Sequence, residues 1–231
     1  MSVSRHQVHS QTSEADTIQY LCGSSPLGTL RLDICPRGIH RLSLRDSQPS
    51  SFSPQSVGVQ FYRTDSTKHA DSMVERTEAW LEDYMADPLS ADEPNMPPLC
   101  VPEGYSEKRL CIYQILQQMT SCGQLTSYKQ LALQAEKVLA RKFSPREVGG
   151  LMAGNDVILL IPCHRVLSTP QLSQARSTPL QAPLVRGGHY GRVPDSPLKL
   201  WLLNRERLTL TNSDTFKCGR LKNAHLVDCM S

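Results

Sequence analysis

A cysteine and a histidine stand side by side in the segment LLIPCHRVLS, which spans residues 159–168. Histidine is the usual base that turns a thiol into a thiolate at neutral pH, and a nearby arginine favours the same charged form. Cys163, His164 and Arg165 therefore have the residue types of an activated nucleophile. Free cysteines are also common in protein cores, so a purely structural thiol is the alternative interpretation. Pro162 favours the first interpretation, because proline ends strand pairing and places the next side chain at an element boundary.

The elements around this segment would bring the thiol close to a DNA-docking motif. The aliphatic run VILLIPC predicts a buried strand over 157–163 that ends at the cysteine. Before it, residues 126–138 and 144–154 carry helical patterns joined by a short basic turn, which fits a helix-turn-helix. The second helix begins with SPRE, a capping box with proline at its first position. Arg146 lies in its first turn, where recognition helices approach DNA.

The other periodic segments predict a mixed α and β protein. Alternating apolar residues predict antiparallel strands between residues 18 and 45. Helices are predicted over 72–85, 107–124 and 197–210, and a long loop over 168–197. We expect an N-terminal tail (1–17), a small β/α domain (18–98), a mostly helical domain with the thiol (99–210) and a C-terminal tail (211–231).

Composition and charge exclude some classes of protein. Of the 231 residues, no run of about 18 apolar residues could span a membrane, and the polar start lacks the apolar core of a signal peptide. We expect a soluble intracellular protein. Its eight cysteines are then reduced, with metal binding or catalysis as the active alternatives.

Charge is distributed unevenly along the chain. Residues 126–207 contain 12 Lys or Arg and 5 Asp or Glu, whereas residues 71–107 contain one Arg and 10 acidic residues. A positive half of this size suggests a polyanionic partner, and nucleic acid is the first candidate because the helix-turn-helix pattern lies in the same half.

Four blocks of sequence resemble one family. GNDVILLIPCHRVL is similar to the active-site signature of the O6-alkylguanine-DNA alkyltransferases, and TSYKQLA, SPREVGGLMAGN and KLWLLNRE match its flanking blocks in the same order. The resemblance covers about residues 16–207 and is strongest over 123–167. It implies an α/β (α+β) fold, with a small N-terminal antiparallel sheet and helix and a C-terminal winged helix-turn-helix-like domain.

The resemblance also implies a role for each site residue. Cys163 is the nucleophile and permanent alkyl acceptor, His164 acts on it through a water as the base, and Glu206 orients the histidine. Tyr128 donates its phenolic proton to the purine. Arg146 fills the gap that the flipped nucleotide leaves. Further DNA or base contacts would come from Gly149 and Gly150, Asn155, the carbonyls of Cys163 and Val166, Arg109, Lys129 and Thr169.

The implied reaction needs no dissociable cofactor. The implied substrate is O6-alkylguanine, and also O4-alkylthymine, in double-stranded DNA. No membrane partner is expected, and the protein would act as a monomer. Nuclear localisation follows only from this function, because no basic cluster in the sequence supports it.

A zinc site is implied less completely. Animal members of the family often hold zinc with two cysteines and two histidines, and Cys35 and His40 match two of those positions. The first position aligns with Asp16 and the last with Leu99, next to Cys100. Zinc prefers a closed set of Cys and His ligands, which Cys22 or Cys100 could complete.

Two insertions depart from the family pattern. About a dozen extra residues follow the active-site segment before HYGRVPD, in which Tyr190 aligns with the lid tyrosine and Arg192 replaces a usual glycine. About four extra residues lengthen the helix-turn-helix turn and add Arg141 and Lys142. We expect the first insertion to change which alkyl groups fit.

Three other functions remain open at this point. A lesion-binding relative would flip the base without accepting the group, but such proteins lack the reactive cysteine. A Cys-His hydrolase unrelated to DNA leaves the basic half unexplained. A sequence-specific regulator needs neither the reactive segment nor the lid.

Overall fold

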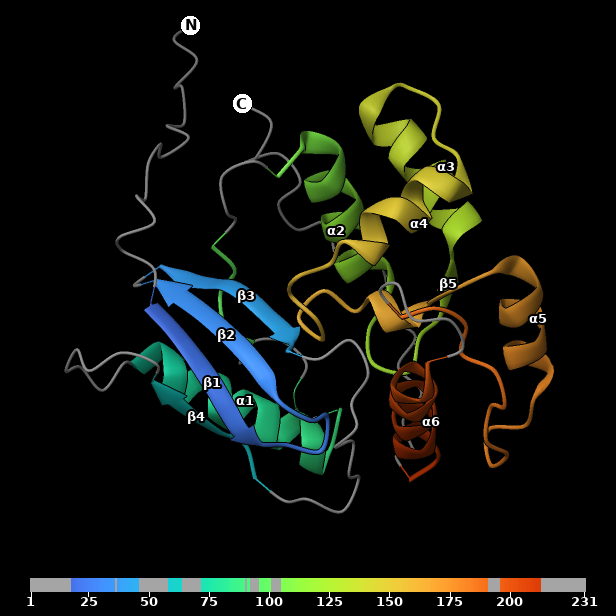
Figure 1. Ribbon diagram of the computed structural model, residues 1–231. Helices are drawn as coiled ribbons and strands as arrows, with labels where there is room; N and C mark the ends of the chain where they lie inside the picture. Colours follow the sequence, from blue (N-terminus) through green and yellow to red (C-terminus); the bar gives the residue numbers. More distant parts are fainter. Residues whose placement is uncertain are drawn as a thin grey trace, which may run out of the picture.

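The protein combines a small antiparallel sheet with a group of helices that lies beside it (Figure 1). The mixed α and β fold class expected from the sequence is confirmed. Within the part that the structure describes, no helix is long and apolar enough to cross a membrane. The computed structural model describes residues 18–35, 37–45, 58–63, 72–89, 91, 96–100, 105–190 and 196–212.

The sheet has the strand order β3-β2-β1-β4, and every neighbouring pair is antiparallel. The alternating Leu30, Leu32 and Ile34 are all buried in the core, as their spacing predicts. The three strands expected between residues 18 and 45 are confirmed. The sequence did not predict β4, because a four-residue edge strand is too short to show alternation. The strands are β1 (Ile18–Ser24), β2 (Leu30–Cys35), β3 (Gly38–Leu44) and β4 (Gln60–Arg63).

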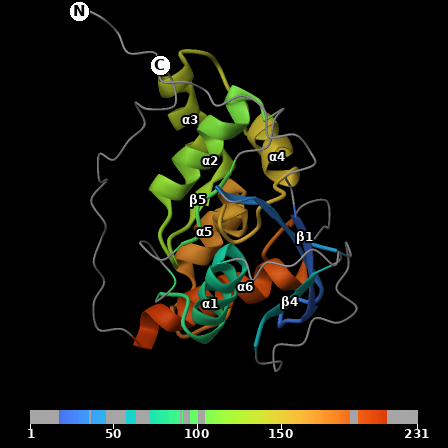
Figure 2. The same cartoon turned by 90° about the vertical axis from the view of Figure 1, so that its left-hand side faces the viewer.

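Helix α1 (Ser72–Ala86) lies beside the β4 edge of this sheet (Figure 2). Glu78 accepts a hydrogen bond from the backbone N–H of Phe61 at 2.6 Å, and Glu82 accepts one from that of Val59 at 3.4 Å. An edge strand leaves backbone donors unpaired, so these carboxylates protect the edge and fix α1 to it. The helix expected over 72–85 is confirmed, and Thr77, Trp80, Leu81 and Tyr84 on its inner face are buried.

Three further helices pack against one another and contain the predicted helix-turn-helix. The capping box at the start of its second helix is present. The Ser144 hydroxyl accepts from the Glu147 N–H at 3.1 Å, and the Glu147 carboxylate accepts from the Ser144 N–H at 2.8 Å. Gly154 caps the other end, as the sequence predicts. The helices are α2 (Glu107–Met119), α3 (Tyr128–Leu139) and α4 (Pro145–Ala153).

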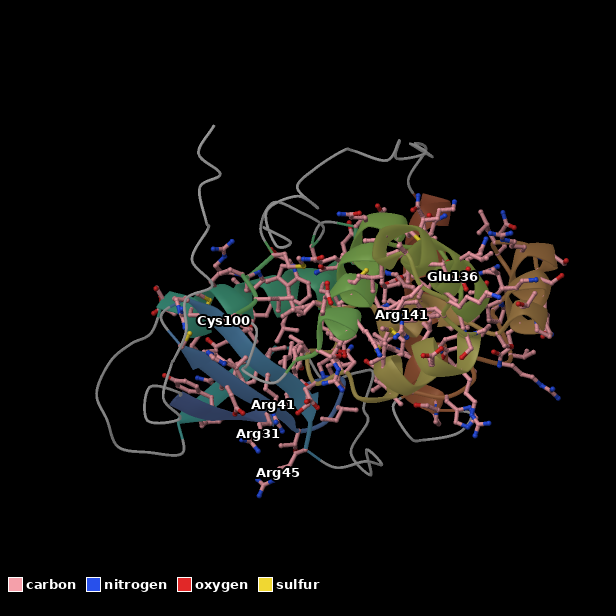
Figure 3. The ribbon with its side chains drawn as sticks, turned by 90° about the horizontal axis from the view of Figure 1, so that it is seen from above. Arg31, Arg41, Arg45, Cys100, Glu136 and Arg141 are labelled. Carbon is pink, nitrogen blue, oxygen red and sulfur yellow. The ribbon has the colours of Figure 1, made fainter. Side chains whose placement is uncertain are left out.

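The lengthened turn between α3 and α4 is held by Arg141 and by carboxylates of the two flanking helices; Figure 3 labels Arg141 and Glu136. The Arg141 guanidinium lies 4.3 Å from the centre of the Phe143 ring and 2.9 Å from the Glu147 carboxylate. Glu136 accepts a hydrogen bond from the Phe143 N–H at 2.9 Å. These contacts use Arg141 within the protein, so the insertion forms a defined turn.

The expected buried strand over 157–163 is wrong. The segment makes only isolated bridges, Val157 with Leu42 and Ile158 with Ile161, and Leu159 has a positive φ of 68°. The run is buried throughout, and an aliphatic run looks the same whether it is extended or turns on itself. The chain then forms a single 3-10 turn, η2 (Cys163–Arg165), and β6 (Val166–Leu167), which pairs in parallel with β5 (Thr126–Ser127).

The expected long loop over 168–197 is wrong in its first part, which forms helix α5 (Thr169–Ser177). Ser168 caps this helix in a capping box with Gln171, and Pro170 lies in the first turn. The pattern S-x-x-Q with an early proline is a helix start that the sequence analysis overlooked. The helix and the chain after it pack on α6 (Pro197–Asn212), where a second small core contains Leu167, Leu172, Ala175, Leu184 and Leu203.

The main core is continuous from the sheet to the helices around the thiol. Backbone hydrogen bonds join the two regions directly: the Leu42 N–H donates to the Asp156 carbonyl at 2.9 Å, and the Ile158 N–H donates to the Leu42 carbonyl at 2.8 Å. The domain boundaries expected from the sequence therefore stay a prediction.

Candidate active site

The Cys163 side chain opens the 3-10 turn and is 7% exposed. The Asn155 side-chain amide donates a hydrogen bond to its sulfur at 3.1 Å and another to the Ile161 carbonyl at 2.9 Å. The Asn155 side-chain oxygen, Oδ1, accepts from the Val157 N–H at 3.0 Å. One side chain thus fixes the turn before the thiol and points a donor at the sulfur.

Burial raises the pKa of the Cys163 thiol above its ordinary value. The Asn155 amide, the positive charge of Lys199 and the Tyr190 hydroxyl act in the opposite direction, but they do not overcome the burial. The resting group is therefore a thiol, and a base has to remove its proton before it can react.

His164 has the environment that such a base requires. Its Nε2 atom lies 2.8 Å from Oε1 of Glu206, and because a carboxylate only accepts, we assign the ring proton to Nε2. Nδ1 is then the accepting nitrogen; it is buried and has no hydrogen-bond partner among the described residues. Burial lowers the pKa of His164, which keeps the imidazole neutral and basic near neutral pH.

Glu206 accepts from the histidine and from three other residues. Arg165 donates to both carboxylate oxygens, from Nη2 at 2.9 Å and from Nε at 3.0 Å. The Gly123 N–H donates to Oε2 at 3.2 Å, and the Tyr84 hydroxyl donates to Oε1 at 2.8 Å. Burial alone would raise the pKa of Glu206, but Arg165 and His164 hold it well below the usual range.

The side chain of Arg165 binds a different group from the one expected. From the sequence, its charge was expected to act on the thiol of Cys163. In the structure, its guanidinium is bound to Glu206, and Nη1 donates to the Thr120 carbonyl at 2.8 Å. Arg165 therefore neutralises the buried carboxylate and ties the thiol turn to α6.

Tyr128 is the first residue of α3, and its ring lies against Gly149 of α4. A Cβ added at Gly149 would lie 4.0 Å from the ring, which is an ordinary van der Waals distance. Burial, and in smaller part the Cys163 group, raise the pKa of Tyr128 to about 12. The phenol is therefore protonated near neutral pH. That is the state needed for a proton donor close to the thiol.

The other predicted DNA contacts lie on several elements around α4. Arg146, Gly150, Lys129 and Thr169 are exposed, and a Cβ added at Gly150 would meet nothing within 4 Å. Arg109 is partly buried, because its guanidinium lies over the Tyr105 ring at 4.7 Å. An open glycine surface beside an exposed arginine leaves room for a close approach of DNA backbone.

Residues 108–207 match the family model described as "6-O-methylguanine DNA methyltransferase, DNA binding domain". The methylated-DNA–protein-cysteine methyltransferase of Mus musculus is 30% identical over 157 residues, which cover 67% of this chain and 72% of the relative. The chain belongs to this family. The human relative of the same name is 32% identical over 145 residues, covering 62% of this chain and 66% of the relative.

A solved O6-methylguanine methyltransferase of Mycobacterium tuberculosis has a similar fold, with a TM-score of 0.55 at 18% identity. The likeness covers 83% of this chain and 94% of that one. The relatives and the family model confirm the family and enzyme class expected from the sequence. The solved structure supports the fold.

The methyltransferase site contains a buried lysine that the sequence analysis missed. Lys199 is 1% exposed, and its ammonium group donates to the Val166 carbonyl at 2.7 Å and to the His189 carbonyl at 3.1 Å. Burial lowers the pKa of Lys199 to about 8. The lysine joins the active-site turn to the chain just before Tyr190. A lysine inside an apolar helix pattern gave no local sign of this contact.

Three possible metal ligands meet at the end of the N-terminal sheet. The ligand atoms of Cys35, His40 and Cys100 all lie within 4.8 Å of one another. Cys100 lies on the side of the molecule away from Arg141 (Figure 3). It is brought there by backbone pairing, because the Cys100 N–H donates to the Ile39 carbonyl at 2.9 Å. Asp16 lies outside the described residues, and so does the side chain of Cys22.

Proposed function

We propose that Cys163 accepts an alkyl group from O6-alkylguanine in DNA, in a single irreversible turnover. The observation that carries this proposal is the buried Nδ1 of His164, which has no hydrogen-bond partner in the part of the chain that the structure describes, while Nε2 is bound to Glu206. His164 directly follows Cys163 in the sequence. Buried acceptors normally have a hydrogen-bond partner, so this nitrogen calls for an explanation other than folding. A role as the base that takes the proton of Cys163 through a water provides one.

The proposed transfer moves the alkyl group from O6 of guanine to the Cys163 sulfur. The Cys163 sulfur attacks the alkyl carbon, a sulfur–carbon bond forms, and the carbon–O6 bond breaks with its electron pair left on guanine. The thiol proton passes to His164 through the water. Tyr128 donates a proton to the purine, and the two side chains return to their resting states by exchange with solvent. The net result is a thioether on the protein and an unmodified guanine, and a thioether has no easy route back.

Access to the alkyl carbon requires the base to leave the duplex. We assign this step to α4, where the exposed Arg146 would replace the flipped nucleotide in the stack. Gly149 and Gly150 would allow the backbone to come close. The carbonyls of Cys163 and Val166 would read the amino edge of the base, each with one acceptor site left beside the bond that it already accepts. Lys129, Thr169 and Arg109 would contact phosphates.

The range of alkyl groups would depend on the chain after α5. Tyr190 is buried, and its hydroxyl acts on the pKa of the Cys163 thiol, which supports the lid position expected for this tyrosine. Arg192, the second expected lid residue, lies outside the described residues. O4-alkylthymine remains a further proposed substrate, the protein would act as a monomer, and a nuclear location follows from the proposed DNA substrate alone.

The test is the intact mass of the native protein after incubation with a duplex that contains one O6-methylguanine. We expect a gain equal to one methylene, on the peptide that contains Cys163, and no gain with the same duplex lacking the lesion. A second dose of lesion should add nothing. Tight lesion binding without a mass gain would favour the lesion-binding alternative, and failure to bind DNA would favour a hydrolase.

We also propose that Cys35, His40 and Cys100 hold a zinc ion that braces the N-terminal sheet. The residues fit the metal, because zinc takes thiolate and neutral imidazole ligands. Nε2 of His40 is buried and has no hydrogen-bond partner within the described ranges, and burial lowers the pKa of this histidine, which keeps it neutral. Zinc would join the hairpin between β2 and β3 to the segment around residue 100.

This zinc proposal predicts one zinc per native chain by mass spectrometry under non-denaturing conditions. Cys100→Ser should lose the bound zinc, whereas Cys111→Ser, which changes a buried thiol on α2, should keep it. Zinc at 100 times its Kd should stabilise the native chain by about 2.7 kcal/mol in thermal unfolding. Equal zinc content in the native and Cys100→Ser proteins would refute the proposed ligand set.

A further inference from the structure

One hydrogen bond connects the N-terminal part of the chain to the proposed catalytic groups. The Tyr84 hydroxyl on α1 donates to Oε1 of Glu206 on α6 at 2.8 Å, although the two residues are 122 positions apart in the sequence. Tyr84 is 3% exposed and Glu206 is 1% exposed, so water does not compete for this bond. Figure 2 shows α1 in front of α6, on the side opposite α3 and α4.

The Tyr84 ring is held firmly enough to direct its hydroxyl. It stacks on Trp80, with ring centres 5.8 Å apart, and the Trp80 indole N–H donates to the Ala91 carbonyl at 2.6 Å. Burial raises the pKa of Tyr84 well above its ordinary value, with Glu206 adding to this effect. The phenol therefore stays a neutral donor at every pH at which the protein works.

The carboxylate atom that receives this bond is the one that holds the histidine. Oε1 of Glu206 lies 2.8 Å from Nε2 of His164, 2.9 Å from Nη2 of Arg165 and 2.8 Å from the Tyr84 hydroxyl. Each donor draws negative charge from the oxygen, and the charge that remains sets how strongly Glu206 stabilises a protonated His164.

We propose that Tyr84 is a positioning residue for alkyl transfer, which sets the base strength of His164 through Glu206. This inference rests on the proposed roles of Cys163 and His164. It gives the N-terminal part of the chain a function in the reaction, because α1 supplies one of the donors that the catalytic carboxylate needs.

The direction of the effect follows from the charge on Glu206. Without the Tyr84 donor, the carboxylate carries more negative charge and holds a protonated His164 more strongly. The pKa of His164 then rises. As the pH is lowered, the imidazole therefore becomes protonated at a higher pH than in the native protein, and the neutral base is lost earlier. Other titratable or charged groups around the pair are unchanged by the substitution: Arg165, Lys199, Cys122, Cys163 and Tyr190.

The experiment compares the single-turnover rate of methyl transfer from a lesion duplex in the native protein and Tyr84→Phe, between pH 5 and 9. We expect the acidic inflection of the Tyr84→Phe profile to lie roughly 0.5 to 1 pH unit higher. Below the inflection, the rate should be roughly three- to tenfold slower than the native rate, with little change at high pH.

A matched control breaks the same helix contact without touching Glu206. Arg205 on α6 donates to the Ala86 carbonyl at the end of α1, at 3.2 Å. Arg205→Met should lower the Tm and leave the pH profile where it is. If Tyr84 only packs the interface, both variants lower the Tm and neither moves the inflection, and the inference is then wrong.

A second variant keeps the test decisive if Tyr84→Phe does not fold. Incorporation of 3-fluorotyrosine at position 84 preserves the shape of the side chain and strengthens its donor. We expect the acidic inflection to move down, opposite to the change in Tyr84→Phe. An unchanged inflection in this protein would overturn the inference. If the native protein itself gains no methyl group, the proposed function fails instead.

Discussion

Replacing Cys163 with alanine should abolish methyl transfer to the protein at any time of incubation, while the protein still binds the lesion duplex. The structure gives one thiol the three features that the reaction needs: an amide donor on its sulfur at 3.1 Å, an adjacent histidine with a free acceptor nitrogen, and a phenol that stays protonated. Because alanine has no nucleophile, the expected rate is zero. Intact-mass measurement checks the transfer, and a gel-shift titration with a lesion duplex checks the binding.

Cys111→Ala is the matched control for this variant. Cys111 is 4% exposed in the core side of α2, close to the 7% of Cys163, and burial raises the pKa of both thiols. No histidine is adjacent to Cys111 in the sequence. The control should lose a similar amount of packing and keep full methyl acceptance. A methyl group that still appears on Cys163→Ala would mean that another cysteine is the acceptor.

Glu206→Gln should slow methyl transfer by roughly 10²- to 10⁴-fold, the usual contribution of a positioned base. The carboxylate fixes the His164 proton on Nε2 and stabilises the positive charge that the ring acquires. A glutamine can turn its amide toward the ring and reverse the tautomer, which puts the proton on Nδ1, where the lone pair is needed. Stopped reactions analysed by mass give the single-turnover rate.

The same substitution should lower the free energy of unfolding by about 3–5 kcal/mol, because it leaves the buried Arg165 without its counter-charge. The pKa of Glu206 is held below its usual range in the folded protein, so this stabilisation is present above about pH 4 and is lost as the pH falls further. The difference in unfolding free energy between native and variant should therefore shrink in strong acid.

Glu136→Gln is the control for the stability measurement. Its carboxylate accepts one backbone N–H, that of Phe143 at 2.9 Å, and forms no ion pair among the described residues. We expect a loss of roughly 1 kcal/mol or less in urea unfolding, since a glutamine oxygen accepts the same bond. Equal losses in the two variants would contradict the role assigned to the Arg165–Glu206 pair.

The family and the elements with strong local patterns were predictable from sequence. The capping box at Ser144 and Glu147 depends on residues three apart, and the alternation of Leu30, Leu32 and Ile34 on residues two apart. Both patterns act through neighbours in the chain, so the sequence contains them completely. The four ordered blocks around Cys163 indicated the family for the same reason, because each is a short continuous stretch.

Local patterns were less informative where burial hides periodicity. The aliphatic run before Cys163 has no polar face, so it looked like a strand although it turns at Leu159. Several prolines and glycines made the stretch after Ser168 look like a loop. Its first residues nevertheless form a capping box, and the Arg207 guanidinium then holds the helix end through the Ala175 carbonyl at 2.8 Å.

By itself, the sequence determined that this chain has a Cys-His-Arg segment with the residue types of a nucleophile and its base, a helix-turn-helix pattern and the blocks of a DNA alkyltransferase. Only the tertiary structure decided what surrounds the thiol. Arg165 binds Glu206 across 41 positions of sequence, and Tyr84 binds the same carboxylate across 122. In the same way, the tertiary structure places Cys100 beside Cys35 and His40 at the end of the sheet. Removing these charged and polar groups from water costs free energy, and the cost is offset only where the groups meet one another. Such meetings depend on which distant segments pack against each other, which no local pattern records.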